Sequence, residues 1–342
     1  MINRYFLTLL VIALGTTTAC SQQISNTTPS DAVNVYPATT VGVSMSATTT
    51  NDFFQDMYNA FKTTAEQQSS LTLLLDEADN DQERQYKQLD DMIAKGAKAL
   101  VVNMVDVSQG TEFVQKYCNK NIPVVYINRN PGEKNIADCQ NAYFVDGDAN
   151  QAGVIQGLKI LESWQKNPDW DKNKDGIIQY AILEGIPNHS GTMARTKWSI
   201  GTMQNYPTLQ VPVHKIFQDY ALFNKQRASD MVESWINDPN FTNVEVLLAN
   251  NDNMAIGAIE TLKQHNIKLP VFGIDAGEKA QELVKSGDMQ ATVFNDYDNQ
   301  AKVALRMAAN LATEKPVMEG IDYRLEYDTV LIPYQDIDVK NN

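Results

Sequence analysis

Short apolar runs rich in β-branched residues alternate along this chain with segments of helical periodicity. The helical segment 81–95 carries an apolar stripe at Tyr86, Leu89, Met92 and Ile93, and 253–265 is a second such segment. Strand and helix in alternation predict parallel sheets with right-handed crossovers, and this many strands fit two doubly wound α/β domains better than one sheet. The predicted strands are 41–45, 71–75, 99–102, 124–127, 142–145, 178–183, 213–217, 244–248, 271–274 and 292–294.

Polar residues stand where these apolar runs end. In doubly wound domains ligands bind at the carboxyl ends of the strands. Asn, Asp and His offer both donors and acceptors, and Arg195 adds a planar fork of donors, so the pattern favours a small, hydroxyl-rich ligand. The same residue types also begin helices, and Asn251 or Asp252 can be simple N-caps. The strand-end residues are Asn103, His189, Asn250, Asn251, Asp252, Asp275, Asn295 and Asp296.

The segment 171–179 has the spacing of a calcium-binding loop. Oxygen-bearing side chains alternate around Gly176, which allows a sharp bend, and Ile177 can offer its backbone carbonyl. The twelfth loop position, which needs a bidentate Glu, is Ile182 inside a predicted strand, so the remaining carboxylate has to come from elsewhere. A metal-free Asp/Asn/Gly turn is the alternative. The side-chain ligands predicted within the loop are Asp171, Asn173, Asp175 and Gln179.

Composition and charge narrow the classes of partner. The 342 residues are 43% hydrophobic and 20% charged, which is typical of globular domains and excludes disorder for most of the chain. A net charge of −14 without a basic block argues against nucleic acid and anionic membrane surfaces as partners.

The N-terminus predicts export. A positively charged start and a short apolar run make 1–19 a signal peptide, and Cys20 directly after it resembles the lipid-bearing first residue of a bacterial lipoprotein. The polar segment 20–36 would then be a flexible tether. Ordinary cleavage after Ala19 is the alternative. No other segment is long and apolar enough to cross a membrane.

Two further cysteines, Cys118 and Cys139, would lie in a compartment where disulfides persist. They can form a disulfide or remain separate thiols, and sequence spacing does not decide between the two. Neither has a zinc-ligand spacing with a histidine, so a zinc site is not expected.

Several ordered segments together resemble the periplasmic galactose/glucose-binding proteins of bacterial sugar transport and chemotaxis, over nearly the whole mature region. They are 79–82, 95–100, 170–179, 194–196, 249–252, 270–275, 295–296 and 299–302. The resemblance implies a type I periplasmic-binding fold with two lobes and a hinge that the chain crosses three times, near 121–123, 295–297 and 331–333. The first lobe would comprise 37–121 and 297–331, and the second lobe 123–295 and 333–342.

The resemblance also assigns both sites. Glu245 would complete the calcium loop, so that the ion has a structural role in the second lobe. Phe53 and Phe223 would stack on the dry faces of a pyranose ring, with Phe223 standing where the family usually has Trp. The residues implied to hydrogen-bond the sugar are Asn103, His189, Arg195, Asn251, Asp275 and Asn295.

Two departures from the family pattern bear on which sugar binds. Gly191 stands where the family has a carboxylate that accepts sugar hydroxyls and pairs with the arginine. The loop before Phe53 is one residue longer, so that either Asn51 or Asp52 is the counterpart of the family's sugar-binding aspartate.

The expected function is therefore an exported, lipid-anchored and monomeric binding protein for a hexose, glucose or galactose, which serves an ABC transporter and a chemoreceptor. A different monosaccharide, a pentose or modified hexose, is the alternative that Gly191 raises. The effector half of a sugar-responsive repressor shares the fold, but an export signal and the lack of a helix-turn-helix argue against it. No nucleophile motif or paired carboxylates suggest an enzyme.

Overall fold

The structure, a computed structural model, describes residues 36–48, 52–337 and 339. The predicted signal peptide, Cys20, most of the tether and Asn51 lie outside the described residues. Tyr36, which we assigned to the tether, is instead buried against the first lobe, where its hydroxyl donates to the Lys302 carbonyl at 2.9 Å. Among the helices of the described part, none has both the length and the hydrophobicity of a membrane span.

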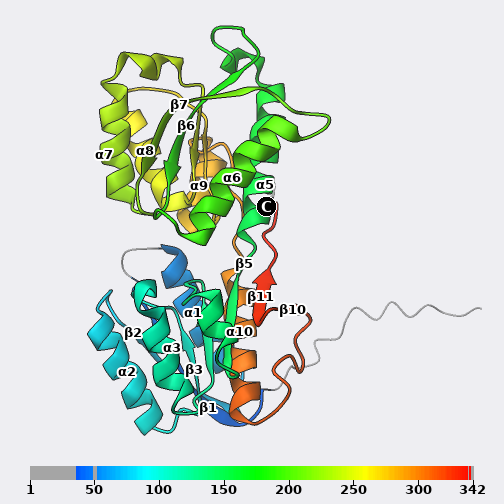
Figure 1. The fold of residues 1–342 in the computed structure, drawn as a ribbon. Coiled ribbons are helices and arrows are strands. Elements are labelled where there is room, and N and C mark those ends of the chain that lie inside the picture. The colour runs from blue at the N-terminus through cyan, green and yellow to red at the C-terminus, as the bar shows by residue number, and fades with distance from the viewer. Residues whose placement is uncertain (1–35, 49–51, 338, 340–342) are drawn as a thin grey trace, which may run out of the picture. The chain divides into compact units, whose positions relative to one another are not determined.

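The first lobe contains a seven-stranded sheet in the order β10-β11-β5-β4-β3-β1-β2 (Figure 1). All its pairs are parallel except β10 with β11. The strands are β1 (Thr39–Met45), β2 (Leu71–Glu77), β3 (Ala99–Val102), β4 (Val124–Ile127), β5 (Ala142–Gly147), β10 (Leu325–Glu326) and β11 (Thr329–Ile332), and the helices are α1 (Asp52–Glu66), α2 (Gln82–Ala94), α3 (Gly110–Cys118), α4 (Glu133–Ala137) and α10 (Tyr297–Ala312).

Alternate residues of these strands belong to two separate hydrophobic cores, because successive side chains of a strand point to opposite faces of the sheet. On one face Val101 of β3 and Val125 of β4 pack with α1 and α10. On the other face their neighbours Leu100 and Val124 pack with α2, α3 and α4. The strands are therefore buried on both sides, which explains why they read as continuous apolar runs.

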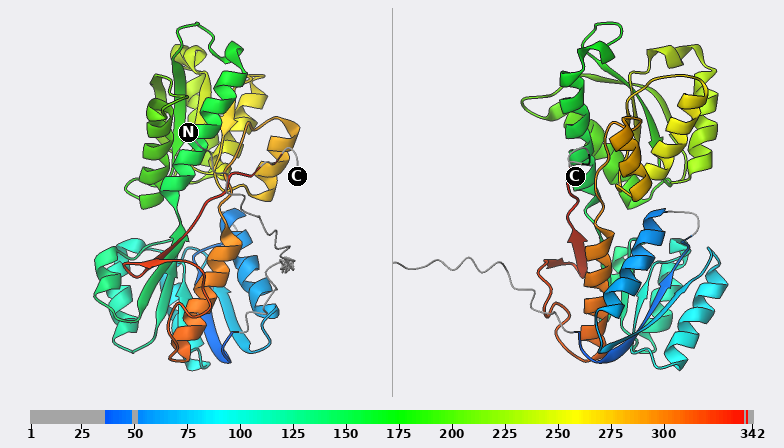
Figure 2. Two further views of the ribbon diagram at one scale, coloured as in Figure 1. Left: turned by 90° about the vertical axis from the view of Figure 1, so that its right-hand side faces the viewer. Right: turned by 180° about the vertical axis from the view of Figure 1, so that it is seen from behind.

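The second lobe repeats this design around a four-stranded parallel sheet in the order β7-β6-β8-β9. Helices α5 and α6 cover one face and α7, α8 and α9 the other (Figures 1 and 2). The elements are β6 (Ile178–Glu184), β7 (Val213–Tyr220), β8 (Val246–Ala249), β9 (Val271–Phe272), α5 (Ala149–Lys166), α6 (Ser190–Asn205), α7 (Lys225–Ile236), α8 (Asp252–Gln264) and α9 (Glu278–Ser286). The predicted two-lobe α/β architecture is thus confirmed.

The first hinge crossing was misplaced by the sequence. We expected it near 121–123, but β4 and β5 both pair in the first sheet, so the chain leaves the first lobe only after Gly147. The reason is that a fully buried strand has the same continuous apolar sequence whichever lobe it belongs to. The later crossings follow Phe294 and Ile332; Phe294 and Gln335 exchange two backbone hydrogen bonds of 3.0 Å, which tie these two segments together.

Two strand predictions also need correction. The run 292–294 forms only isolated bridges, such as Asp275 with Phe294, and not a strand of its own. The short strands β10 and β11 were not predicted. They have two and four residues and are separated by a polar turn, so their periodicity is too weak to indicate a strand.

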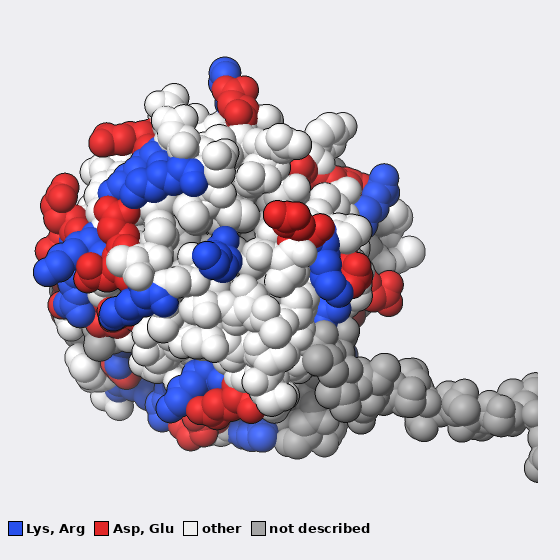
Figure 3. All heavy atoms as spheres, turned by 90° about the horizontal axis from the view of Figure 1, so that it is seen from below, with Lys and Arg blue, Asp and Glu red and all other residues white. Residues whose placement is uncertain are grey.

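On the face shown in Figure 3, acidic and basic side chains are interspersed between uncharged ones. Opposite charges side by side weaken the long-range field of either sign on this face.

The structure joins Cys118 and Cys139 in a disulfide with Cα atoms 6.0 Å apart. The bond connects the end of α3 to the segment after α4, next to the core that both helices share with β4 and β5. Of the two alternatives left open by the sequence, pairing is the correct one.

Replacing both cysteines by serine should lower the free energy of unfolding by about 3 kcal/mol, because the bond closes a loop with a sequence separation of 21. Urea denaturation of the oxidised protein measures this value. Reductant should lower the stability of the wild type and leave that of the double variant unchanged; equal sensitivity of both proteins would contradict the assignment.

Candidate functional site

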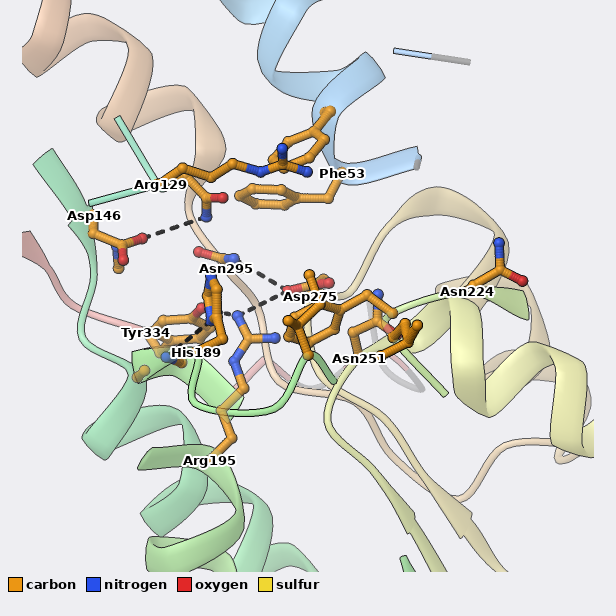
Figure 4. A pocket seen from close by; sticks show the side chains of 18 of the residues that line it. Phe53, Arg129, Asp146, His189, Arg195, Asn224, Asn251, Asp275, Asn295 and Tyr334 are labelled. Carbon is orange, nitrogen blue, oxygen red and sulfur yellow. Dashed lines mark hydrogen bonds and ion pairs between the residues drawn. The ribbon is translucent and has the colours of Figure 1, made fainter. Parts of the chain in front are cut away.

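A cavity of about 230 Å³ lies where strands of both sheets end (Figure 4). Amide, carboxylate, guanidinium and aromatic side chains line it from both lobes. The first lobe contributes Phe53, Phe54, Asn80, Asn128, Arg129 and Asp146, the second lobe His189, Gly191, Arg195, Phe223, Asn251 and Asp275, and the later crossings Asn295 and Tyr334.

Seven of the ten predicted ligand residues line this cavity, and two others, Asp52 and Asn103, do not. Asn51 lies outside the described residues. Asp52 is the exposed first residue of α1 and lines a smaller cavity beside the main one. Asn103 is fully buried in the first lobe and does not reach the cavity.

Asn103 is held by the protein itself. Its Oδ1 accepts from the backbone N–H and the hydroxyl of Ser46, at 3.2 and 2.5 Å, and its Nδ2 donates to the Ile127 carbonyl at 3.1 Å. These contacts connect the ends of β1, β3 and β4. The sequence argument failed because a strand-end amide can satisfy neighbouring strands as well as a ligand.

Arg195 of α6 contacts several of the groups on the second-lobe side of the cavity. Its guanidinium donates to the Asn250 carbonyl at 2.7 Å and to the Tyr334 hydroxyl, and lies 3.4 Å from Oδ1 of Asp275. Gly191 therefore does not leave Arg195 without a carboxylate, since Asp275 supplies one. The Nε of Arg195 is buried and has no hydrogen-bond partner among the described residues.

Asp275 follows β9 in a strained conformation, with φ of 126° in the region that favours glycine. Its Oδ1 also accepts from Nδ2 of Asn295 at 3.1 Å. Burial raises the pKa of Asp275, and the neighbouring Arg195 opposes this shift. Strain and a perturbed carboxyl at one position are typical of a functional site.

His189 presents a neutral imidazole. Burial, together with Arg195 and Arg129, lowers its pKa to about 4. The backbone N–H of Gly191 donates to Nδ1 at 3.1 Å, as expected for the N-cap of α6. The ring proton therefore resides on Nε2, which makes this nitrogen a donor.

Two aromatic rings come from opposite lobes. Phe53 lies on α1 and packs edge-to-face on Tyr297. Phe223 precedes α7 rather than beginning it, and both Phe223 and Leu222 have positive φ values, 58° and 56°. Two consecutive non-glycine residues in this region are strained, which indicates that the turn is held to place the ring at the cavity.

Asn251 combines both of its predicted roles. It is the N-cap of α8, with Oδ1 accepting from the Met254 N–H at 3.1 Å, and it lines the cavity. Its amide nitrogen has no partner among the described residues, so this group is a donor that a ligand can use.

Sequence reasoning missed Arg129, Asp146 and Tyr334. Arg129 follows β4 and donates to the carbonyls of Met104 and Val105, both at 2.9 Å. Asp146 stands at the end of β5, and Tyr334 follows β11. The strand-end pattern of the other polar residues is present at these positions as well, because each lies at or just after the end of a strand of the first sheet.

The loop 171–179 and Glu245 come together in the second lobe. Glu245 is buried just before β8, and its two carboxylate oxygens accept from the N–H groups of Lys172 at 2.8 Å and Gln179 at 3.1 Å. Asp171 accepts from the N–H of Gly176 at 2.9 Å, where φ is 72°. The predicted distant carboxylate thus lies beside the loop.

The donor set of this loop fits a hard cation that prefers oxygen. Oε1 of Gln179 is buried without a hydrogen-bond partner among the described residues, and burial raises the pKa of Glu245. No group of three or more His, Cys, Asp or Glu side chains in the described part is placed to hold a metal ion. A cation here would therefore need the Asn, Gln and backbone oxygens of the predicted set.

Residues 41–316 match the family model of the periplasmic binding protein domain. The chain belongs to this family. Like other members it is a solute-binding protein and not an enzyme. It is 37% identical over 271 residues to the D-galactose/methyl-galactoside binding periplasmic protein MglB of Haemophilus influenzae, over 79% of this chain and 81% of that protein.

Solved structures of other binding proteins share the fold. A solute-binding protein of Bacillus halodurans with bound myo-inositol has a TM-score of 0.69 and 26% identity, over 90% of this chain and 96% of that one. One of Actinobacillus succinogenes with bound D-allose has a TM-score of 0.73 and 22% identity, over 89% of this chain and all of the other, which supports the fold alone.

Asn103→Ala should lower the free energy of unfolding by about 1–3 kcal/mol, because a buried hydroxyl and a carbonyl lose their partner. Urea denaturation measures it, with Asn59→Ala on the exposed side of α1 as the matched control, for which we expect a change within about 0.5 kcal/mol. Equal, small effects of both substitutions would contradict the structural role of Asn103.

Proposed function

We propose that this protein is the extracytoplasmic sugar-binding component of an ABC transporter, with a hexose, glucose or galactose, held between its two lobes. The observation that carries the proposal is the cavity itself, which combines strand-end hydrogen-bonding groups with two aromatic rings from opposite lobes. The relative MglB, named for binding D-galactose, supports this class of ligand.

The polar groups suit a ligand made of hydroxyls. Each hydroxyl is at once a donor and an acceptor, so its site needs both. Asp275 and Asn295 offer acceptor oxygens, while Arg195, Asn251 and Nε2 of His189 offer donors. Because these groups are already fixed by hydrogen bonds within the protein, a ligand need not order them, which favours affinity.

The apolar groups suit the faces of a sugar ring. Once the hydroxyls are paired, the C–H faces of a pyranose remain dry, and aromatic rings can cover them. Phe53 and Phe223 approach the cavity from different lobes. A sugar that contacts both rings bridges the lobes, and such a contact favours the closed arrangement over the open one.

The size of the cavity favours a monosaccharide. Its volume of about 230 Å³ lies below the roughly 300 Å³ at which pockets for drug-sized ligands begin. Gly191 keeps a different monosaccharide, a pentose or a modified hexose, as the second candidate, because it removes a carboxylate from the second-lobe side of the cavity.

A thermal-shift screen of D-glucose, D-galactose, D-ribose, D-allose and myo-inositol tests the proposal. A ligand that binds only the native state raises the melting temperature with the logarithm of its excess. We expect glucose or galactose to give the largest increase. The absence of any shift with all five compounds, supported by titration calorimetry, would refute the proposal.

Asp275→Asn should weaken hexose binding by roughly 30-fold, about 2 kcal/mol, because the charged acceptor beside Arg195 is lost. Titration calorimetry measures the affinity. Asp230→Asn, an exposed position on α7 outside the cavity, is the control and should bind as the wild type does. If the two variants bind equally well, Asp275 has no role in the site.

We propose further that the loop closed by Glu245 holds a structural calcium ion. The oxygen donors, the buried Oε1 of Gln179 and the buried carboxylate of Glu245 support this assignment. Calcium bound there would connect the segment before β6 to the start of β8, and this binding energy would add to the stability of the second lobe.

Glu245→Gln should abolish the stabilisation that calcium gives. The melting temperature of the wild type should fall when a chelator replaces calcium, whereas that of Glu245→Gln should be the same in both conditions. Glu282→Gln, exposed on α9, should respond as the wild type does. A wild-type melting temperature that is indifferent to the chelator would exclude the ion.

The partner that follows from this function is the membrane part of an ABC transporter. Family membership places the protein outside the cytoplasm. The lipid anchor at Cys20 remains a prediction outside the described residues. No observation on the described surface favours a chemoreceptor, so we propose the transporter alone.

A further inference from the structure

Asp146 lies at a position that neither the motifs nor the strand-end argument identified. It is the last residue but one of β5, directly before the first crossing, and β5 pairs there with β11, which leads to another crossing. Figure 4 shows its carboxylate on the first-lobe side of the cavity. Of the described lining residues, Asp146 and Asp275 are the two carboxylates, one from each lobe.

The hydrogen bonds of Asp146 use one of its two oxygens. Oδ1 accepts from the N–H of Gly147 at 2.8 Å and, more weakly, from Nδ2 of Asn128 at 3.4 Å. Oδ2 accepts no hydrogen bond from the described residues. It is nevertheless accessible, because it does not belong to the fully buried polar atoms that lack a hydrogen-bond partner. A carboxylate oxygen without a partner in a residue that lines a binding cavity is suited to accept a hydrogen bond from a ligand.

The carboxylate is held in position by close packing of the backbone beside it. A Cβ on Gly147 would come within 2.5 Å of the Tyr334 ring and 2.9 Å of Oδ1 of Asn295. These contacts leave no space for a side chain at residue 147, so the backbone that carries Asp146 is fixed against two other residues of the cavity. Positioning of this kind is what a ligand-binding group requires.

The surroundings of Asp146 are those of a binding-site carboxyl. Burial raises its pKa to about 7, and Arg195 acts in the opposite direction. Perturbed carboxyls of this kind cluster in functional sites. Asp275 contacts Arg195 and Asn295 through its Oδ1, so each of the two carboxylates uses one oxygen within the protein.

We propose that Asp146 determines sugar specificity: its Oδ2 accepts a hydrogen bond from one hydroxyl of the ligand. The inference rests on the proposed function and adds to it. Because Asp146 stands in β5, the hydroxyl that it recognises lies on the first-lobe side of the sugar.

The test combines Asp146→Asn with a series of monodeoxy sugars derived from the hexose that binds the wild type. Asparagine retains the shape and one acceptor oxygen but turns a donor or a weaker acceptor toward the ligand. We expect at least tenfold weaker binding of the parent hexose by calorimetry. One deoxy analogue should bind the wild type about as weakly as the parent hexose binds Asp146→Asn. The same analogue should bind Asp146→Asn only slightly more weakly than it binds the wild type, because the interaction is already lost.

Asp322→Asn, an exposed substitution in the same lobe, is the control and should bind the parent hexose as the wild type does. Asp146→Ser is a second variant, for use if the asparagine disturbs the fold as judged by the melting temperature. Binding of the parent hexose by both Asp146 variants within twofold of the wild type would overturn the inference while the proposed function stands. Failure of every monosaccharide to bind the wild type would overturn both.

Discussion

The buried guanidinium of Arg195 is the interaction on which the rest of the site depends. A charge removed from water is tolerated only when it is paired and its donors are used. The terminal nitrogens of Arg195 meet this requirement through Asp275, the Asn250 carbonyl and the Tyr334 hydroxyl, which come from three separate segments of the chain. One side chain of α6 therefore fixes the ends of β8 and β9 and the last crossing relative to one another.

The same constraint explains where strain accumulates. Asp275 and Phe223 both have positive φ, an unfavourable backbone for residues with a Cβ. The ion pair with Arg195 holds the first, and the turn before α7 holds the second. In both cases the strained residue presents its side chain to the cavity, so the cost in stability is linked to the preorganisation of a binding surface.

The sequence predicted the architecture well because strands buried on both faces and amphipathic helices have distinct periods. It predicted His189 and Asp275 as cavity residues, since polar groups at the ends of parallel strands converge at one edge, whereas Phe53 was implied by the family resemblance alone. It could not separate Asn103 from these, because an amide that bonds neighbouring strands has the same signature as one that binds a ligand. It also placed the first crossing too early and did not identify Asp146, although Asp146 directly follows the predicted strand 142–145 and so has the same strand-end signal.

The central claim is that a hexose is held at once by Arg195 and its partners in the second lobe and by the aromatic and carboxylate groups of the first. A crystal structure of the protein with the hexose that stabilises it most tests this claim directly. We expect the sugar ring between Phe53 and Phe223, with hydrogen bonds to Asp275 on one side and Asp146 on the other. A sugar bound elsewhere, or in contact with one lobe alone, would contradict it.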